Sequence, residues 1–213
     1  MTTATARQDT KEECATLLYA RFRLNGDGAR RYLFDPANGH MVAVSCAGAP
    51  GLDQPVRWAL RDGELVIRTT SKLQSKVPRE LGDLLHGPRT ELVKLHTGDH
   101  VAVKLLAAPT RTVPNGYRQL LGEDNKRERR GAVVPIVNDE EIYQWLETRL
   151  SQAFVVDTLS FRKRLVRSRQ LWHKWFAVDV NATAIVTSPK EAAQLLVGRS
   201  KAYGFGLPVI SQL

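Results

Sequence analysis

An α+β fold built from two tandem ferredoxin-like (RRM-like) domains is predicted by three features of this chain. Its 213 residues suffice for two small domains of about 100 residues each. Hydrophobic and turn patterns give the order β-α-β-β-α-β twice, which is the element order of a ferredoxin-like domain. A glycine-rich loop near the C-terminus, residues 198–206, joins the last predicted helix to the last predicted strand. We therefore expect an N-terminal domain over 1–74, a linker over 75–95 and a C-terminal domain over 96–213.

The N-terminal half begins with a predicted strand and an amphipathic helix. Asp9 has the character of an N-cap, and Glu12 follows three residues later as in a capping box. Apolar residues then recur at helical spacing until the glycines at 26 and 28 end the helix. In order, we predict a strand over 2–8, the helix with Cys14, Leu17, Leu18 and Phe22 on one face, strands over Arg30–Phe34 and His40–Ala47 joined by a turn at 35–39, a short helix over Val56–Leu60 and a strand over Glu64–Thr70.

The C-terminal half repeats that order around a polar insertion. Val101, Val103 and Leu105 alternate with other residues, which is the pattern of a strand with one buried face. In order, we predict a strand over His100–Ala107, a basic insertion over 110–131, a helix over Asp139–Gln152, strands over Phe154–Leu159 and Trp175–Val186, a helix over Ser188–Val197 and a final strand.

Composition narrows the class of protein. No apolar run approaches the roughly 18 residues that cross a membrane, and the N-terminus lacks the pattern of a signal peptide, so we expect a cytoplasmic protein with no membrane partner. Cys14 and Cys46 lack metal-type spacing, and no His/Cys/Asp/Glu cluster predicts a metal. We expect no small-molecule cofactor. A formal net charge of +9 and a pI near 9.8 predict a polyanionic partner.

The glycine-rich loop predicts a contact with an anion. Glycines permit positive φ and let a phosphate approach the backbone closely. The loop lies after a helix and before a strand, whereas nucleotide-binding glycine motifs lie between a strand and the following helix. Mononucleotide binding is therefore set aside, and glycines that only turn the chain are the alternative. The residues predicted to bind here are Gly198, Arg199, Lys201, Tyr203, Gly204 and Gly206.

Two further segments concentrate positive charge in the same half. Each contains aromatic residues, and Lys and Arg contacts to phosphates supply most sequence-independent affinity for nucleic acids. RNA is favoured because ferredoxin-like sheets recur as RNA platforms. Solvated loops are the alternative. The predicted RNA-binding residues are Arg111, Arg118, Lys126, Arg127, Arg129 and Arg130 in the first segment and Arg162, Lys163, Arg164, Arg167, Arg169 and Lys174 in the second.

Four stretches resemble a known family. They cover residues 96–113, 129–157 and 197–213, and more thinly 32–48. The last 17 residues (VGRSKAYGFGLPVISQL) stand where the family has its signature glycine-rich loop. On these stretches the chain resembles CasE, the CRISPR repeat-processing endoribonuclease of type I-E Cascade complexes, within the wider Cas-six superfamily. The family's fold, two ferredoxin-like domains, agrees with the predicted element order.

The resemblance implies a reaction and partners. The substrate would be a precursor crRNA, cut without a metal at the base of the repeat hairpin. The ribose 2′-hydroxyl would attack the adjacent phosphate and leave a 2′,3′-cyclic phosphate and a 5′-hydroxyl. Such chemistry needs a general base, a general acid and cations for the phosphorane. The protein would then stay on the mature crRNA 3′ hairpin beside the CRISPR effector backbone subunits.

The sequence departs from the family at the expected catalytic histidine. The family pattern L-Y-x-x-H on its first helix would fall on residues 18–22, where Phe22 takes the histidine position. Tyr19, Arg21 and Arg23 are then the predicted catalytic residues, with the arginines stabilising the phosphorane. An exposed helix face is the alternative for these three. The other functions left open are a non-catalytic crRNA-hairpin-binding subunit and a protein that binds a small anion or another protein. The CRISPR subtype, I-E or type IV-like, also stays open.

Overall fold

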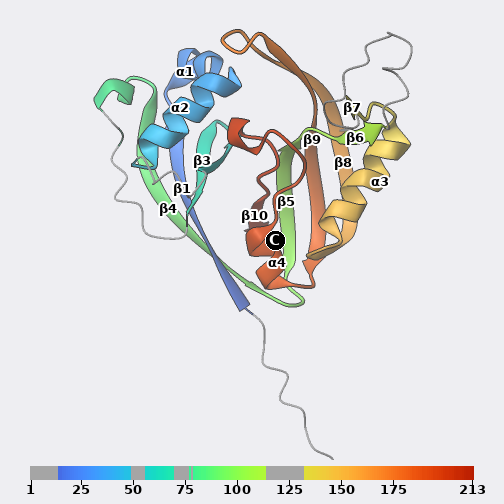
Figure 1. Cartoon of the computed structure of the whole chain (residues 1–213). Coiled ribbons are helices and arrows are strands. Elements are labelled where there is room, and N and C mark those ends of the chain that lie inside the picture. The colour runs from blue at the N-terminus through green and yellow to red at the C-terminus, as the bar shows by residue number, and fades with distance from the viewer. Residues whose placement is uncertain (1–13, 49–55, 70–76, 78, 114–131) are drawn as a thin grey trace, which may run out of the picture.

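Two four-stranded antiparallel sheets organise the computed structural model (Figure 1). The structure describes residues 14–48, 56–69, 77, 79–113 and 132–213. Its elements, in order, are β1 (Cys14–Leu24), α1 (Gly26–Leu33), α2 (Pro36–Cys46), β2 (Arg57–Arg61), β3 (Glu64–Thr69), η1 (Arg79–Leu81), β4 (Leu85–His96), β5 (His100–Ala107), β6 (Thr110–Val113), β7 (Ala132–Pro135), α3 (Asp139–Leu150), β8 (Phe154–Ser168), β9 (His173–Val186), α4 (Pro189–Gln194), η4 (Lys201–Tyr203) and β10 (Val209–Gln212).

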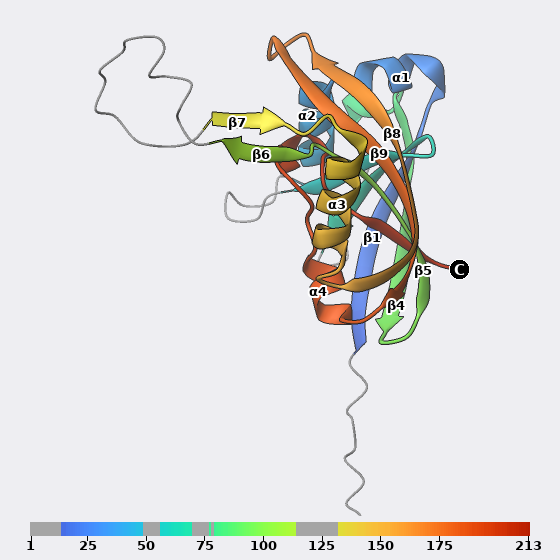
Figure 2. The ribbon, with the colours of Figure 1, turned by 90° about the vertical axis from the view of Figure 1, so that its right-hand side faces the viewer.

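Both sheets have the same strand order. The first sheet runs β2-β3-β1-β4 and the second runs β10-β5-β9-β8, so in each the first strand of the domain lies between its third and fourth. This arrangement is ferredoxin-like, and the predicted α+β fold of two such domains is confirmed. Helices α1 and α2 cover one face of the first sheet, α3 packs on the second, and α4 lies in the core that the two sheets share, against β1 (Figures 1 and 2).

The predicted first helix is wrong, because residues 14–24 form the central strand β1. Leu17 and Tyr19 face the core shared with the second domain, whereas Ala20 and Phe22 face the helices α1 and α2. A strand that is buried on both faces carries a near-continuous apolar run. Such a run also satisfies helical spacing, and periodicity alone does not separate the two. The strand predicted over 2–8 lies outside the described residues.

The next two predicted strands are helices. Asp35 and Pro36 do not form a turn but begin α2, where the Asp35 side chain accepts a hydrogen bond from the backbone N–H of Ala37 at 3.0 Å and proline occupies the first turn. Proline fits that position because its missing N–H is not needed there. Gly39 lies within α2, and a glycine is needed at this position because a Cβ would come 2.2 Å from the ring of Trp58. The helix predicted over residues 56–60 is instead strand β2.

The rest of the first sheet consists of a tight turn between β2 and β3 and the long strand β4. Asp62 and Gly63, both at positive φ, form the two-residue turn that pairs β2 with β3, and the Asp-Gly signal for it was present in the sequence. Most described residues of the predicted linker form β4, which pairs with β1. Gly87 and Pro88 are tolerated there because the register shifts between Arg21 and Arg23. Residues 85–95 therefore belong to the first sheet.

The second domain follows its prediction more closely. Strands β5, β9 and β10 and helix α3 lie where they were expected, β8 extends nine residues further to Ser168, and α4 ends at Gln194. The first residues of the predicted basic insertion form β6, which pairs with β7 directly after the insertion. A continuous core links the two domains, because Leu17 and Tyr19 of β1 share one apolar cluster with β5, α3 and β10. Among the described residues, no helix combines the length and hydropathy of a membrane crossing.

Candidate functional site

The terminal glycines serve packing more directly than anion contact. Gly198, Gly204 and Gly206 all have positive φ. A Cβ on Gly204 would lie 2.8 Å from the Trp58 ring, and one on Gly206 would lie 2.1 Å from the carbonyl oxygen of Val197. Because Gly204 and Gly206 are also buried, their backbone is not open to a phosphate. The geometry favours the alternative in which these two glycines shape the chain.

The cations of the same loop point outward from a fixed segment. The Trp58 Nε1–H donates to the carbonyl of Ala202 at 2.8 Å, and the Trp175 Nε1–H donates to the Ser200 hydroxyl at 3.0 Å. One of these tryptophans comes from each domain. Arg199 and Lys201 are exposed, so the loop holds both charges where an anion can reach them.

The predicted basic run at 162–174 is divided between the two faces of a long hairpin, β8 and β9. Arg162 and Arg164 share a face with Asp179, and Arg164 pairs with that carboxylate at 3.2 Å. Lys163 lies on the opposite face, where it forms an ion pair with Asp139 of α3. The run is therefore not one patch. Near the hairpin tip, Arg167, Arg169 and Lys174 are exposed.

The hairpin tip is fastened to the first domain. Asp35, the N-cap of α2, accepts hydrogen bonds from the Ser168 hydroxyl at 2.7 Å and the Arg169 backbone N–H at 2.8 Å. The Gln170 amide donates to Asn38 at 2.7 Å. Burial opposes ionisation of Asp35, but the hydrogen bonds from Ser168 and Arg169 outweigh it and lower the pKa of this carboxyl. The ionised carboxylate thus fixes the tip in place.

One end of the molecule gathers exposed cations from both domains. Helices α1 and α2, the hairpin tip and the terminal loop lie together there (Figures 1 and 2), and the rings of Trp175 and Tyr203 stand 5.6 Å apart between hairpin and loop. Among the described residues, no carboxylate pairs with these cations. We call this set the basic end; its members are Arg30, Arg31, Arg167, Arg169, Lys174, Arg199 and Lys201.

The remaining predicted RNA-binding residues are placed less favourably. Arg111 is exposed but forms an ion pair with Glu141 of α3 at 2.7 Å. The rest of that segment, comprising Arg118, Lys126, Arg127, Arg129 and Arg130, lies outside the described residues.

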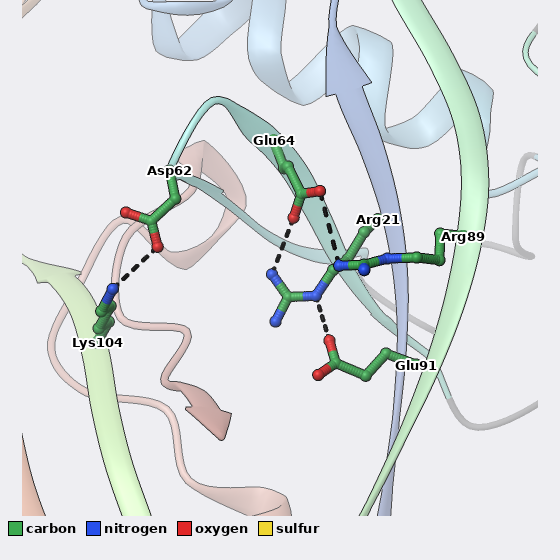
Figure 3. Close-up of polar contacts among 6 residues, drawn as sticks. All are labelled: Arg21, Asp62, Glu64, Arg89, Glu91 and Lys104. Atoms are coloured by element: carbon green, nitrogen blue, oxygen red, sulfur yellow. Dashed lines mark hydrogen bonds and ion pairs between the residues drawn. The ribbon is translucent and has the colours of Figure 1, made fainter. Parts of the chain in front are cut away.

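Of the three predicted catalytic residues, two are engaged inside the fold. Tyr19 is 0% exposed, and its hydroxyl donates to the Pro208 carbonyl at 3.3 Å and accepts from the Ile210 N–H at 3.2 Å. Arg21 forms ion pairs with Glu91 and, at 3.1 Å, with Glu64 (Figure 3). Burial by itself would lower the pKa of Arg21, but the hydrogen bonds and charges of Glu91 and Glu64 outweigh burial, so the pKa is raised. The geometry therefore gives Tyr19 and Arg21 structural contacts.

Arg23 is the exposed member of the three, and the fold brings a histidine beside it. Arg23 of β1 pairs in register with His86 of β4, which places both side chains on one face of the sheet. The His86 Nε2 lies 2.9 Å from the Asn25 Oδ1, directly before α1. The sequence did not reveal this neighbour because residue 86 fell within the predicted linker. The only local feature of the sequence at His86 was the Gly87-Pro88 pair that follows it, which is typical of a turn.

A small pocket opens between the end of β1, the start of α1 and the β2–β3 turn. It encloses about 310 Å³ and is lined by Arg23, Asp27, Arg30 and Glu64 among others. With Asp62, which also lines it, two cations and three carboxylates border this cavity next to the basic end. Among the described residues, no group of three or more His, Cys, Asp or Glu side chains could hold a metal ion.

The larger cleft between the domains is closed by ion pairs. It measures about 390 Å³ and lies between the β2–β3 turn and the second sheet. Arg61 reaches across to Asp179 at 2.6 Å, and Lys104 reaches back to Asp62 at 3.0 Å. Burial lowers the pKa of Arg61, and Asp179 opposes that effect. These ion pairs link the domains across the cleft, and Arg30 and Tyr203 line the side of the cleft that adjoins the basic end.

Comparison with known proteins identifies the family. The family model described as "CRISPR associated protein" matches residues 27–211. The chain belongs to this family. A search of curated proteins finds no match to the sequence, so the remaining comparisons of this CRISPR-associated protein are structural.

Three solved structures share its fold. Cse3 from Thermus thermophilus, bound to an RNA representing a pre-cleavage complex, is 21% identical with a TM-score of 0.69, covering 92% of this chain and 98% of that one. Cas6e from Escherichia coli K-12 is 16% identical with a TM-score of 0.65, covering 92% and 100%. A chain of a CRISPR RNA-guided surveillance complex is 16% identical with a TM-score of 0.58, also covering 92% and 100%. The predicted resemblance is thereby confirmed.

The catalytic motif of the CRISPR-associated protein needs a correction. Residues 18–22 were matched to a pattern that belongs on the family's first helix, but they lie on strand β1. The first described helix is α1, Gly26–Leu33, and it contains no histidine either. Helix α2, which follows directly, contains His40.

Proposed function

We propose that this protein binds the hairpin of a CRISPR repeat RNA through its basic end and cleaves the precursor crRNA beside that hairpin. The observation that carries the proposal is the set of exposed cations that α1, the hairpin tip and the terminal loop hold at one end of the molecule, without a carboxylate partner in the described part of the chain. Lys and Arg side chains on fixed elements suit a folded phosphate backbone, because the backbone that carries them needs little further ordering on binding.

The solved relatives support this choice of ligand. Cse3, which shares the fold over 92% of this chain, is bound to an RNA that represents a pre-cleavage complex. Another relative is part of an RNA-guided surveillance complex. We extend both features to this protein: after cleavage it stays on the mature crRNA 3′ hairpin as a subunit beside the effector backbone.

Cleavage is assigned to the pocket at the start of α1. Here Arg23 and Arg30 stabilise the phosphorane charge, and His86, one strand away from Arg23, exchanges protons with the 2′-hydroxyl or the leaving oxygen. Arginine itself is a poor proton carrier since it stays charged. The nucleophile is the RNA's own 2′-hydroxyl, so the proposed reaction needs no metal-bound water. Tyr19 and Arg21 support the strand that presents Arg23.

The test is cleavage of the cognate repeat RNA in EDTA. Wild-type protein should leave a 2′,3′-cyclic phosphate and a 5′-hydroxyl. His86→Ala should slow the reaction by about 10²- to 10⁴-fold while hairpin affinity stays unchanged. His100→Ala, an exposed histidine on β5, is the matched control. Cleavage that is equally fast in both variants would remove His86 from the mechanism.

A second function is favoured by one observation: α1 carries no histidine. In this alternative the protein only holds the crRNA hairpin in an effector complex and another nuclease trims the RNA. Tight, salt-sensitive binding of intact repeat without any cleavage would establish it. The absence of salt-sensitive RNA binding would overturn both functions and leave a protein that binds a small anion or another protein.

A further inference from the structure

Trp172 at the tip of the β8–β9 hairpin is 94% exposed. The other tryptophans of the chain lie in or against apolar clusters: Trp58 and Trp175 are buried, and Trp145 packs on the main core. An indole ring gains free energy by leaving water. A single ring left almost fully in solvent, while the same fold buries two others and packs the fourth on the core, indicates a site that a ligand covers.

The backbone at Trp172 is also unusual. Its φ is +50°, a left-handed conformation that glycine and asparagine favour and that a bulky aromatic residue rarely adopts. Residues held in such conformations cluster at functional sites, where the surrounding structure imposes them. A glycine would suit the turn better, so the local fold gives no reason for tryptophan at this position.

The tip presents the ring from a rigid base. Asp35 and Asn38 of the first domain hold Ser168, Arg169 and Gln170 through the hydrogen bonds described above. On the other side of the tip, the ring of His173 packs edge-on against Trp175 at 4.4 Å. Trp172 is thus fixed between two anchored neighbours, and little further ordering is needed when it meets a ligand.

The charges around the ring select the class of ligand. Arg169 and Lys174 flank it, and both are exposed without a carboxylate partner among the described residues. A ligand that satisfies this surface carries negative charge and offers a flat π-face. RNA does both, because phosphates pair with the cations and any base stacks on an aromatic ring.

We propose that Trp172 stacks on an unpaired base of the bound RNA, next to the stem whose phosphates the basic end holds. The inference rests on the proposed function and adds a contact to it. In a stem the bases already stack on each other, so the ring meets a base outside the stem, in the loop or in a flank.

Binding measured with a series of repeat RNAs tests the contact. Trp172→Ala should weaken binding of the intact repeat by about 5- to 150-fold, the effect of losing one base stack. Trp172→Phe, which keeps a ring, should retain most of the affinity. Leu171→Ala is the matched control at the neighbouring exposed residue. Trp172→Ala should leave the salt dependence of binding unchanged, because no phosphate contact is lost, whereas Lys174→Ala should reduce its slope by about 1.

RNAs with single abasic positions outside the stem locate the partner base. For one of them, wild-type protein and Trp172→Ala should bind equally, since the stacking partner is already missing. Thermal unfolding serves as the folding control, and neither Trp172→Ala nor Trp172→Gly should lower the midpoint.

Three outcomes overturn the inference. If Trp172→Ala binds the intact repeat as tightly as wild type, the stacking contact fails while the proposed function stands. If it binds RNA normally but no longer associates with effector subunits, the ring docks a protein. If wild-type protein binds no repeat RNA, the proposed function and the inference fail together.

Discussion

The two domains share one strand order but use their arginines differently. In the first domain, Arg21, Arg61 and Arg68 are no more than 10% exposed and contact carboxylates or carbonyl groups. In the second, Arg199 and Lys201 stand exposed without carboxylate partners among the described residues. Arg61 and Arg68 therefore join the two domains and Arg21 joins strands of one sheet, whereas Arg199 and Lys201 are accessible to a ligand. A net charge of +9 does not by itself distinguish these roles.

The position of each arginine on its sheet explains the contrast. Arg68 of β3 faces the core between the domains, where its guanidinium donates to the carbonyls of Pro208 at 2.5 Å and Ala193 at 3.2 Å. Ala193 lies in α4, and Pro208 directly precedes β10, the edge strand of the second sheet. The hairpin tip and the terminal loop contact the first domain through Ser168, Gln170 and Ala202, whereas the side chains of Arg169, Arg199 and Lys201 are exposed.

The largest predicted effect is on Arg68. Arg68→Ala should lower the free energy of unfolding by about 3 kcal/mol, because several buried acceptors lose a charged donor. Arg57→Ala is the matched control on the neighbouring strand: burial and then the charge of Arg68 lower the pKa of Arg57, so its removal should cost less than about 0.5 kcal/mol. Urea denaturation measures both. Equal costs would contradict the structural role given to Arg68.

Arg21 and Arg23 sharpen the comparison within a single strand. Arg21→Ala should cost about 2 kcal/mol of stability, since Glu64 and Glu91 lose their shared partner. Arg23→Ala should leave stability within about 0.5 kcal/mol yet slow cleavage of the repeat RNA. Chemical denaturation and single-turnover cleavage are run on both variants. A folding defect in Arg23→Ala, or a pure rate defect in Arg21→Ala, would reverse the assignment.

For the second domain the expected effect is on binding rather than stability. The double variant Arg199→Ala with Lys201→Ala should reduce the slope of log affinity against log salt by about 2, one for each phosphate contact. Lys163→Ala should leave the slope unchanged, because Lys163 pairs with Asp139 on the other face. Fluorescence anisotropy at several salt concentrations gives the slopes. An unchanged slope in the double variant would exclude the terminal loop from the RNA contact.

The smallest effect concerns the clamp between the domains at the hairpin tip. Asp35→Ala should cost about 1 kcal/mol at neutral pH through the lost cap and the lost contacts to Ser168 and Arg169. The folded-state pKa of Asp35 is lowered, so its contribution is present above about pH 4 and is lost as the pH falls further. Thermal melts between neutral and acidic pH should show the wild type converging on the variant. Glu80→Ala, at an exposed carboxylate, should show no such convergence.

The second domain was predictable from sequence and the first largely was not. Strand β5 alternates because only one of its faces is helix-covered, and α3 has a clear N-cap at Asn138 with Ile142 and Leu146 on its buried face. Strand β1 is buried on both faces, so its apolar residues carry no period that separates strand from helix. A different ambiguity led to the turn predicted at Asp35-Pro36: an Asp-Pro pair is typical both of turns and of the first residues of a helix.

The candidate site shows the same limit. The exposed cations of the loop and hairpin were found from composition, because clustered Lys and Arg are visible in a sequence. His86 was not found, since it reaches Arg23 only through the pairing of β1 with β4 across more than 60 intervening positions. Tyr19 was assigned to chemistry although the fold buries it.

The sequence by itself determined the tandem α+β architecture, the basic character of the C-terminal half and the family to which the chain belongs. These depend on local periodicity, composition and motif, which need no knowledge of neighbours. The tertiary structure decided which described arginines are buried and which are exposed, that His86 lies beside Arg23, and that Trp172 stands exposed at the hairpin tip. Long-range pairing and burial create those properties, and both arise only when segments distant in the chain come together.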